Sequence, residues 1–294
     1  ALRGLSRLAL KQGSLKQAET LSEEAWDLHR GDTQAALGVI SLLLRQGHYI
    51  QADTALLKAR RHQALTREQL HSLQARLHYL RYRDDTPPAG PVNPHACIKT
   101  AFTLDPAFAP AAESYARQLL RDRKRRHALA VIEKAWKACP HPCLSNILLE
   151  PDGVGAAPAD KLRLRVEKLR RLQPNHIESH IALARAGLNS SRWDLARNHL
   201  KAALAIAPQA RVILLLAQLE EQSMQDEAAA AQWLKRMPEA APDPAWICRQ
   251  CGHHSPSWAI HCHACATLNG YRWEATPGPA IAPAASDLLE ATRL

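Results

Sequence analysis

The sequence has 294 residues, of which 46% are hydrophobic but only 5% aromatic, and it carries a formal net charge of +10. A core of leucine and alanine suits helix packing and argues against an all-β fold, while the basic surplus favours acidic partners. The sequence has neither a long uninterrupted apolar run nor a signal peptide, so we expect no membrane-spanning helix within it.

The chain repeats itself at a constant spacing. Four prolines keep this spacing, namely Pro106, Pro140, Pro174 and Pro208. The spacing equals the period of tetratricopeptide (TPR) repeats, which are helix–turn–helix units of about 34 residues. The sequence therefore predicts an all-α, right-handed superhelix of six to seven TPR units over residues 1–240. Because Ala1 falls inside the first helix of a unit, we expect the chain to be a piece of a longer protein.

Two stretches disturb the predicted array. Residues 84–94 hold four prolines and a glycine, which a helix does not tolerate, and we expect an inserted loop of about eight extra residues there. In the fifth unit, residues 151–155 interrupt the first helix, and only 160–172 is a clear helix. The clearest unit is 177–208, in which apolar residues recur at helical spacing on both sides of a tight turn.

A cysteine cluster follows the array, in a predicted small module over residues 241–275 that we call the knuckle. Its pattern is Cys248-x2-Cys251-x10-Cys262-x2-Cys265. Each Cys-x2-Cys turn presents two thiolates on one side of a loop, and two such turns close a tetrahedron around a metal. Zinc is the default, with iron in a rubredoxin-like site as the alternative. Four thiolates leave no open position, so the site is expected to be structural rather than catalytic.

Four histidines crowd this knuckle: His253, His254, His261 and His263. They could replace a cysteine as ligands, but four thiolates already suffice, so we expect them to support the ligands or to lie at the surface. The tail over residues 276–294 is rich in alanine and proline and too poor in apolar surface to fold alone, so we expect it to be disordered.

A second cysteine cluster reads Cys139-Pro140-His141-Pro142-Cys143. A Cys-Pro pair resembles haem-regulatory motifs, in which a thiolate is an axial ligand. Pro140 also stands in register with the repeat prolines and needs no ligand to explain it. Haem binding through Cys139 or His141 is therefore kept as an alternative, and Cys97 is expected to be a small buried residue.

Arginines fall on the first-helix positions that usually face the inner groove of a TPR array. Arg117 and Arg121 are four residues apart, on one helix face, and Arg185 occupies the same repeat position as Arg117, two repeats further on. A guanidinium group binds carboxylates through two parallel hydrogen bonds. We therefore expect Arg117, Arg121 and Arg185 to contact an acidic protein segment laid along the groove. Long charged side chains are equally compatible with a solvated groove.

The array with its terminal cysteine knuckle resembles the HemY-type TPR proteins of α-proteobacteria, on the residues Asp243-Pro244-Ala245-Trp246-Ile247-Cys248 and the two Cys-x2-Cys pairs. That resemblance implies an adaptor associated with haem biosynthesis, on the cytoplasmic side of the inner membrane, anchored by helices that precede residue 1. LapB-type proteins, which act in lipopolysaccharide regulation, also join TPRs to a rubredoxin-like knuckle. Trp246-Ile247-Cys248 is also similar to the zinc fingers of Ran-binding proteins, although Ser255 replaces their asparagine.

These features together predict a non-enzymatic scaffold that binds protein partners in its groove and a metal in its knuckle. No pairing of nucleophile and base, phosphate-binding loop or carboxylate pair stands out in the sequence. The competing functions are a haem carrier and nucleic-acid binding through the basic surface, the latter being the less favoured. Nucleic-acid affinity would fall steeply with salt.

Overall fold

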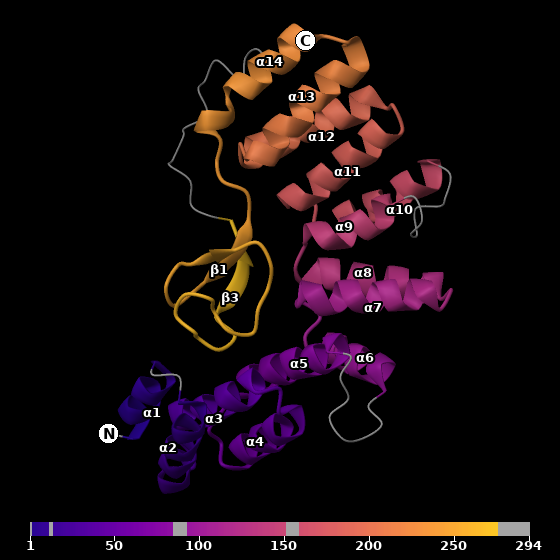
Figure 1. Cartoon of the computed structure of the whole chain (residues 1–294). Coiled ribbons are helices and arrows are strands. Elements are labelled where there is room, and N and C mark those ends of the chain that lie inside the picture. Colours follow the sequence, from indigo (N-terminus) through magenta and orange to yellow (C-terminus); the bar gives the residue numbers. More distant parts are fainter. Residues whose placement is uncertain (1, 12–13, 85–92, 151–158, 276–294) are drawn as a thin grey trace. The chain divides into compact units, whose positions relative to one another are not determined.

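The computed structural model describes residues 2–11, 14–84, 93–150 and 159–275. Within these ranges it contains fourteen α-helices, one 3-10 helix and three short strands (Figure 1). Residues 85–92 of the predicted insertion and the whole predicted tail lie outside the described residues. The predicted fold class is confirmed: the chain is a mostly helical TPR-type repeat protein with a cysteine knuckle at its C-terminal side.

The helices follow one another in pairs. The first six are α1 (Leu2–Lys11), α2 (Leu15–Leu28), α3 (Thr33–Arg45), α4 (Tyr49–Arg61), α5 (Arg67–Arg83) and α6 (Pro94–Leu104). The next four are α7 (Ala109–Arg121), α8 (Arg125–Ala138), α9 (Pro142–Leu149) and α10 (Ala159–Leu172). The last four are α11 (Ile177–Asn189), α12 (Trp193–Ile206), α13 (Ala210–Met224) and α14 (Glu227–Lys235), followed by the 3-10 turn η1 (Met237–Glu239).

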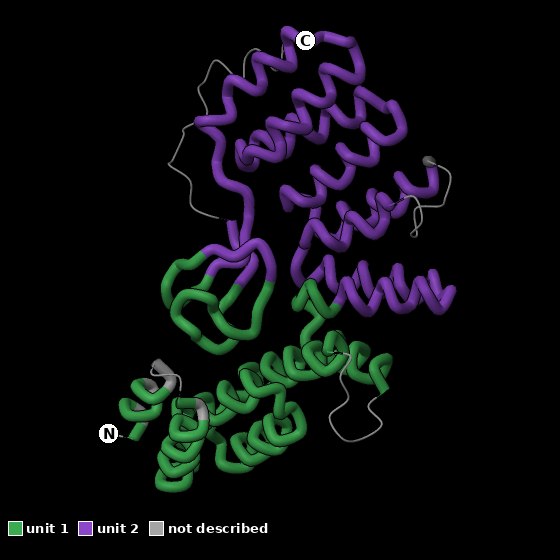
Figure 2. Tube along the Cα trace, in the orientation of Figure 1, with its two compact units in different colours: residues 1–111, 248–253, 258–271 green, residues 112–247, 254–257, 272–294 purple. Residues whose placement is uncertain are grey.

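The chain divides into two compact units (Figure 2). Unit 1 contains residues 1–111, 248–253 and 258–271, and unit 2 contains residues 112–247, 254–257 and 272–294. Neither unit coincides with the predicted array or the predicted knuckle, because the four-cysteine loops group with the N-terminal helices. The four cysteines therefore belong to the same compact unit as the N-terminal helices.

The repeat register is visible in the turns between paired helices. One residue of the turn adopts a left-handed backbone conformation in four pairs, at Gly47, Arg123, Ser191 and Gln225. Ser191 follows Arg123 by two repeat periods and precedes Gln225 by one. Arg123 follows Gly47 by two periods and eight further residues. The helices on either side of the predicted insertion thus keep the register with eight added residues.

In unit 1 the starts of α3, α5 and α6 are fixed by side chains that accept backbone hydrogen bonds. Asp32 accepts from Gln34 and Ala35 at the start of α3, and Asn93 accepts from two N–H groups at the start of α6. Thr66 and Gln69 form a reciprocal capping box at the start of α5. Each such cap satisfies N–H groups that have no partner inside the helix. The sequence thus determines where α3, α5 and α6 begin.

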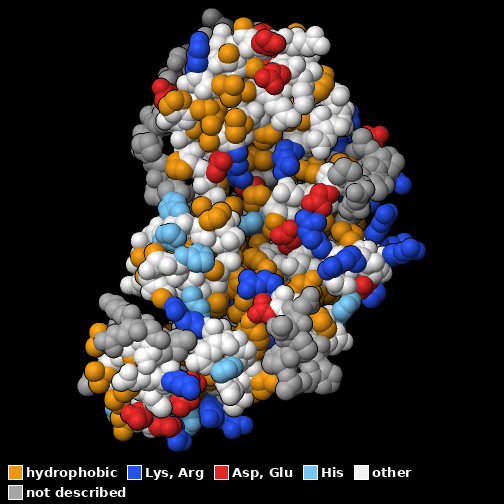
Figure 3. All heavy atoms as spheres, in the orientation of Figure 1, with side chains coloured by type: hydrophobic (Ala, Val, Ile, Leu, Met, Phe, Trp, Pro, Cys, Tyr) orange, Lys and Arg blue, Asp and Glu red, His pale blue; other side chains and the backbone are white. Residues whose placement is uncertain are grey.

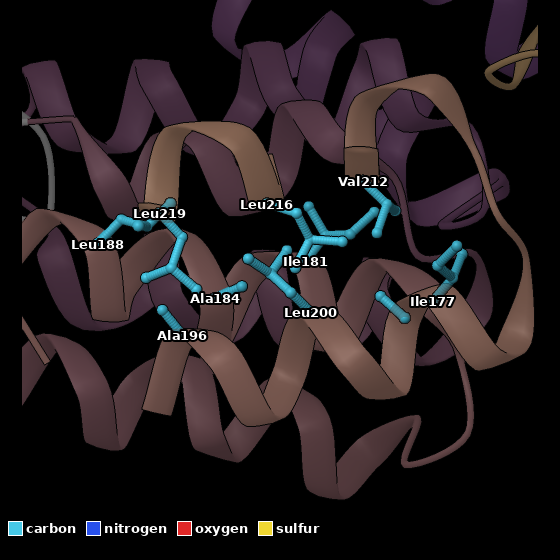
Figure 4. Close-up of a cluster of buried hydrophobic side chains, with 10 residues drawn as sticks. Ile177, Ile181, Ala184, Leu188, Ala196, Leu200, Val212, Leu216 and Leu219 are labelled. Carbon is cyan, nitrogen blue, oxygen red and sulfur yellow. The ribbon is translucent and has the colours of Figure 1, made fainter. Parts of the chain in front are cut away.

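In unit 2 a continuous apolar core joins three successive helices (Figure 4). Its buried members are Ile177, Ile181, Ala184 and Leu188 of α11, Ala196, Leu200 and Ala203 of α12, and Val212, Leu216 and Leu219 of α13. The helices α11 and α12 approach closely at Gly187, where an added Cβ would lie 2.9 Å from the backbone nitrogen of Ala196. Small residues therefore permit the close contact that the periodicity predicts. Ile206, at the end of α12, remains 48% exposed although its spacing is that of the apolar face.

The knuckle contains a small three-stranded sheet in the order β2-β1-β3, formed by β1 (Ala245–Cys248), β2 (His254–Ser255) and β3 (Tyr271–Glu274). The strands β1 and β2 are antiparallel, with Trp246 opposite Ser255 and Ile247 opposite His254. Among the described helices, none combines the length and the apolar character required to cross a membrane.

Candidate functional site

The four predicted cysteine ligands lie together in unit 1. All four sulfur atoms are within 4.8 Å of one another, and this is the only group of three or more such ligands within the described ranges. The Sγ atoms of Cys248 and Cys265 are 3.7 Å apart, and those of Cys251 and Cys262 are 3.6 Å apart. A tetrahedron of thiolates around zinc, with Zn–S bonds of about 2.3 Å, places its sulfur atoms about 3.8 Å apart. The arrangement therefore fits a four-thiolate metal site.

The two Cys-x2-Cys turns have the same backbone geometry. In the first, the N–H of Gly252 donates to the carbonyl of Cys248 at 2.8 Å, and the N–H of Cys248 donates to His253 at 2.9 Å. In the second, Ala266 donates to Cys262 at 2.9 Å, and Cys262 donates to Thr267 at 3.0 Å. The same offsets of four and five residues recur, so each turn presents its two sulfur atoms in the same way. Two such turns bring the four sulfur atoms together, and no large hydrophobic core is required for this.

The residue directly after each Cys-x2-Cys pair has a left-handed backbone conformation. This residue is a glycine in the first turn and an alanine in the second. Gly252 has φ +72° and Ala266 has φ +60°. A Cβ at Gly252 would meet nothing within 4 Å, so a substitution there acts through the backbone alone. Because this region costs a non-glycine residue about 1–2 kcal/mol, the two positions form a matched pair.

We predict that Ala266→Gly raises the free energy of unfolding of the metal-loaded chain by about 1 kcal/mol and that Gly252→Ala lowers it by a similar amount. Urea unfolding of both variants beside the wild type measures the two changes. Equal effects of the same sign at the two positions would contradict the paired geometry.

Hydrogen bonds around the sulfur atoms favour the thiolate at two of the four cysteines. Burial raises the pKa of Cys262, but the N–H groups of Cys265 and Ala264 and other hydrogen-bond donors outweigh it and lower this pKa to about 6. Hydrogen bonds from Thr267 lower the pKa of Cys265. At Cys251 a backbone hydrogen bond favours the thiolate, yet its contacts with the other sulfurs and burial raise the pKa to about 12. Close thiols of this kind ionise together only when a cation binds, which releases protons.

Gly270 is a part of the site that the spacing of cysteines does not reveal. A Cβ at Gly270 would lie 3.0 Å from the Sγ of Cys248 and 3.3 Å from Thr267. The carbonyl of Gly270 accepts from Arg249 at 3.1 Å, which ties the residue before β3 to the first turn. A glycine is therefore required where the backbone passes directly over a ligand sulfur.

Histidines gather over the knuckle surface (Figure 3), and two of them, His261 and His263, form hydrogen bonds beyond the first Cys-x2-Cys turn. Nε2 of His261 is 2.9 Å from the hydroxyl of Ser41 on α3. His263 has its backbone N–H bonded to the hydroxyl of the buried Tyr271, at 3.1 Å. Neither imidazole belongs to the ligand group, which contains cysteines alone.

The cysteine loops are seated on the first helices of unit 1 by a polar network. Asn269 donates to Ser72 at 3.0 Å and accepts from Nε of Arg76 at 3.2 Å. Arg76 has a side chain only 8% exposed and forms an ion pair with Asp105. Burial lowers the pKa of Arg76, and the Asp105 charge opposes that shift. A buried guanidinium with these partners fixes the loop through directional bonds.

An aromatic cluster completes the contact between the loops and the helices. Trp258 lies edge-on to Tyr79 of α5, with ring centroids 5.6 Å apart, and to Phe108, at 4.8 Å. The guanidinium of Arg76 lies over the ring of Phe108, 4.2 Å from its centroid. Sequence periodicity does not predict this contact, because Trp258 and Tyr79 are separated by most of the repeat array along the chain. The cysteine loops of unit 1 are thus anchored by both polar and aromatic contacts.

The predicted haem residues lie at the junction of α8 and α9. Nδ1 of His141 accepts from the N–H of Cys143 at 3.2 Å and lies 3.0 Å from its sulfur. The imidazole is buried against two indoles, with its centroid 5.8 Å from Trp246 and 4.2 Å from Trp273. Burial raises the pKa of the Cys143 thiol well above its usual range. Axial ligation by His141 would require an indole to move, and Cys139 caps the end of α8. Cys97 is buried, as expected.

Burial of His141 makes stability depend on pH. Burial, followed by the positive charge of Arg211, lowers its pKa from 6.5 to about 4. Between these values only the unfolded chain binds the proton, so stability falls as the pH falls. We predict that acidification from pH 7 to pH 5 removes about 2 kcal/mol through this group alone.

The matched variant is His141→Asn, because asparagine can still cap the start of α9 but does not titrate. Urea unfolding at pH 7 and pH 5 should show a smaller loss in the variant than in the wild type. Identical losses would mean that His141 is already protonated in the folded chain. Five half-buried histidines also have lowered pKa values, and they affect the stability of the wild type and of the variant equally.

The predicted groove arginines already have partners within unit 2. Arg117 on α7 donates to both oxygens of Glu150 at 2.8 Å each, and to Glu113 at 3.0 Å. The hydrogen bond from Arg117 lowers the pKa of Glu150. Arg185 on α11 donates to the side-chain oxygen of Asn146 at 2.5 Å. Asn146 lies in α9 and Glu150 directly follows it, whereas Glu113 lies in α7 with Arg117. Arg121 is the last residue of α7.

Comparisons with known proteins give a distant relative. No protein-family model matches the sequence. The chain is 30% identical over 193 residues, 63% of its length, to a "Probable magnetosome protein Mms48" of Magnetospirillum gryphiswaldense. It spans 41% of the length of that relative.

Solved structures also resemble the chain. One is PilW, titled a widely conserved type IV pilus biogenesis factor, with a TM-score of 0.41, 15% identity, and coverage of 70% of this chain and 92% of that one. Another is a tetratricopeptide repeat protein from Parabacteroides merdae, with a TM-score of 0.38, 13% identity, and coverage of 81% and 91%. The paired helices at the repeat spacing make the chain a TPR-type repeat protein, and Mms48 is a distant relative of it.

Proposed function

We propose that the chain is a non-enzymatic scaffold that holds protein partners on its helical repeats and carries one structural metal in its knuckle. The observation that supports it best is the character of the cysteine cluster. Its four thiolates fill a tetrahedral shell, which leaves no position for a substrate or an activated water. The loops that carry the cysteines are also tied to helices of the repeat array, through His261 to Ser41 and through Asn269 to Ser72 and Arg76. The site is therefore suited to stabilising the fold rather than to catalysis.

Cys248, Cys251, Cys262 and Cys265 would hold the metal. Zinc fits four thiolates best, with iron as the alternative. The bound ion supplies cross-links between the two turns and charge that keeps all four sulfurs ionised. Gly270 leaves space beside the first ligand, and Thr267 orients the last through a contact of 3.1 Å between its hydroxyl and the sulfur of Cys265. These residues do not carry out a reaction.

Arg117, Arg121 and Arg185 are the partner-contact residues that this function needs. Because Glu150 occupies the guanidinium of Arg117, an acidic partner segment must exchange with it. An exchange of one carboxylate for another conserves the two-bond geometry and requires little net electrostatic change. The arginines would then select partners by charge and by the spacing of carboxylates.

Charge reversal at Arg117 and Arg185 tests this function. The double substitution to glutamate is expected to abolish capture of partner proteins, with helicity and metal content unchanged. Reversal of Arg171, in α10, and Arg192, directly before α12, provides the charge-matched control, because both side chains are more than half exposed. If the Arg117/Arg185 variant still captures partner proteins, these arginines do not contact the partner. The same conclusion follows if the Arg171/Arg192 control loses as much capture as the Arg117/Arg185 variant.

We propose three candidate cellular settings for this scaffold. The HemY-type resemblance supports an adaptor near haem biosynthesis on the cytoplasmic face of the inner membrane, anchored by a segment outside this chain. The similarity to Mms48 supports a second setting, a scaffold at the magnetosome, and LapB-type regulation of lipopolysaccharide is the third. Isolation of the full-length protein with its membrane and identification of cross-linked partners separates the three, because each names a different set of proteins.

Haem carriage is the alternative activity. Titration of haem into the wild type and into Cys139→Ala distinguishes it from the scaffold. A Soret band that is present in the wild type and lost in the variant would favour the carrier. The burial of His141 between indoles favours the scaffold.

A further inference from the structure

An extended segment of the chain lies along the starts of first helices in unit 2. The N–H of Ala241 donates to the carbonyl of Pro208 at 2.9 Å, and the N–H of Ala210 donates to the carbonyl of Ala241 at 3.1 Å. This exchange forms a parallel bridge between Gln209 and Ala241. The segment therefore binds its neighbour through main-chain pairing, in the way that an added peptide strand binds a protein edge.

The carboxylate of this segment meets Arg211 at the start of a helix. Oδ1 of Asp243 accepts from the N–H of Arg211 at 3.1 Å in the first turn of α13, and lies 3.8 Å from its Nε. Helix starts favour negative charge. The guanidinium is held in place because it donates to Gln209 at 2.9 and 2.8 Å and forms an ion pair with the buried Glu178. Arg211 is thus oriented by contacts that do not involve Asp243.

Three residues after Asp243, an indole occupies the start of α9. Trp246 is 8% exposed and lies against His141, and Trp273 packs on both rings, with the two indole centroids 5.7 Å apart. Because Nδ1 of His141 accepts the Cys143 N–H, its neutral ring carries the proton on Nε2, which has no hydrogen-bond partner among the described residues. A buried donor and an aromatic contact therefore stand beside the carboxylate site.

Prolines on each side of Asp243 hold the segment extended. Pro242 and Pro244 flank the carboxylate, fix their own φ angles and disfavour the helical region at the residue before each. An extended segment that is already restricted loses less conformational entropy on binding. The contacts are thus those of a short linear ligand: main-chain pairing, a carboxylate, and an indole three residues later.

We propose that the starts of α9, α11 and α13 form a reading surface for an extended protein segment with a carboxylate three residues before a tryptophan, and that the chain's own Asp243–Trp246 segment fills this surface. The inference rests on the proposed scaffold function and names the class of partner. A partner with the same pattern displaces the chain's own segment. Because that segment is covalently tethered, its effective concentration is in the millimolar range, and a free peptide competes poorly with it.

The test uses the full chain and a fluorescein-labelled peptide with the sequence of residues 240–247. In the double variant Asp243→Ala/Trp246→Ala the chain's own segment keeps only its main-chain pairing at Ala241, so the peptide competes with a weakened segment. Fluorescence anisotropy should show binding about ten times tighter than to the wild type. Addition of Arg211→Ala to the double variant should abolish the binding. A peptide in which the aspartate is replaced by asparagine and the tryptophan by alanine should not bind to any of the chains.

Trp246 lies two residues before a cysteine ligand, so metal content and helical circular dichroism are measured on each variant. If the double variant loses either, Asp243→Ala alone is used, and a gain in peptide affinity over the wild type is still expected. Absence of peptide binding to a folded, metal-loaded variant overturns the inference. That result leaves the scaffold function standing, because partner capture through Arg117 and Arg185 is measured separately.

Discussion

A chain in which Cys262 is replaced by serine is expected to lose its metal and the structure of residues 245–274, while the helices of the array keep their signal. Cys262 is buried, and its Sγ lies 3.6 Å from that of Cys251. Structural zinc sites supply about 10–16 kcal/mol of apparent binding free energy at neutral pH, far more than a module of this size gains from its own core. Removal of one ligand therefore removes most of what folds the knuckle.

Hydrogen exchange of the knuckle amides measures this change beside metal content. The N–H groups of Cys248, Gly252 and Ala266, each bonded inside the turns, should lose protection in Cys262→Ser. The matched control is Cys97→Ser, because Cys97 is also buried but belongs to α6 and to no ligand group. Protection and metal retained in Cys262→Ser at the level of the control would show that the turns fold without the ion.

Trp258→Ala is expected to lower the free energy of unfolding by about 3–5 kcal/mol. The indole is 7% exposed and makes edge contacts with Tyr79 and Phe108. Each aromatic pair contributes about 0.5–1.5 kcal/mol beyond the area that it buries, and the cavity left by alanine adds to the loss. The variant should therefore release the cysteine loops from α5.

Urea unfolding gives the free energy, and the metal content distinguishes anchoring from ligation. The metal should remain at the wild-type level in Trp258→Ala, because the indole does not contact a ligand sulfur through any hydrogen bond in the described structure. Trp258→Phe keeps a ring in the cluster and should recover about half of the loss. A loss below about 1 kcal/mol for the alanine variant would mean that Trp258 contributes no more than an exposed residue does.

Sequence periodicity predicts the local architecture because it is a local property. Prolines at the repeat spacing follow the second helices α6, α8, α10 and α12, and alanines such as Ala196 allow close packing, so the pairing of these helices follows directly. The metal site is equally local: two short turns need only short-range geometry to aim their sulfurs at one point. The left-handed position at Ala266 is not evident from the sequence, because alanine, unlike Gly252, rarely adopts that conformation.

Long-range contacts have no periodic signal. His261 contacts Ser41, 220 residues away in the sequence, and Asn269 contacts Arg76, 193 residues away. The position of the cysteine loops on these helices therefore depends on tertiary packing. The groove arginines show the same limit. Their placement on first helices follows from the repeat, but the pairing of Arg117 with Glu150 is decided by packing within unit 2. Arg76 is a buried charge in α5. The only sign of it in the sequence is that an arginine lies on a helix face that is otherwise rich in leucine.

Elemental analysis of the chain purified without added metal tests the metal centre most directly. We predict one tightly bound zinc or iron ion per chain, lost in Cys262→Ser and retained in Cys97→Ser. The absorption spectrum identifies the ion, because an iron–thiolate site absorbs visible light and zinc, with its filled d shell, does not. A stoichiometry near zero in a chain with intact helical circular dichroism, unchanged by Cys248→Ser, would contradict the four-cysteine metal site.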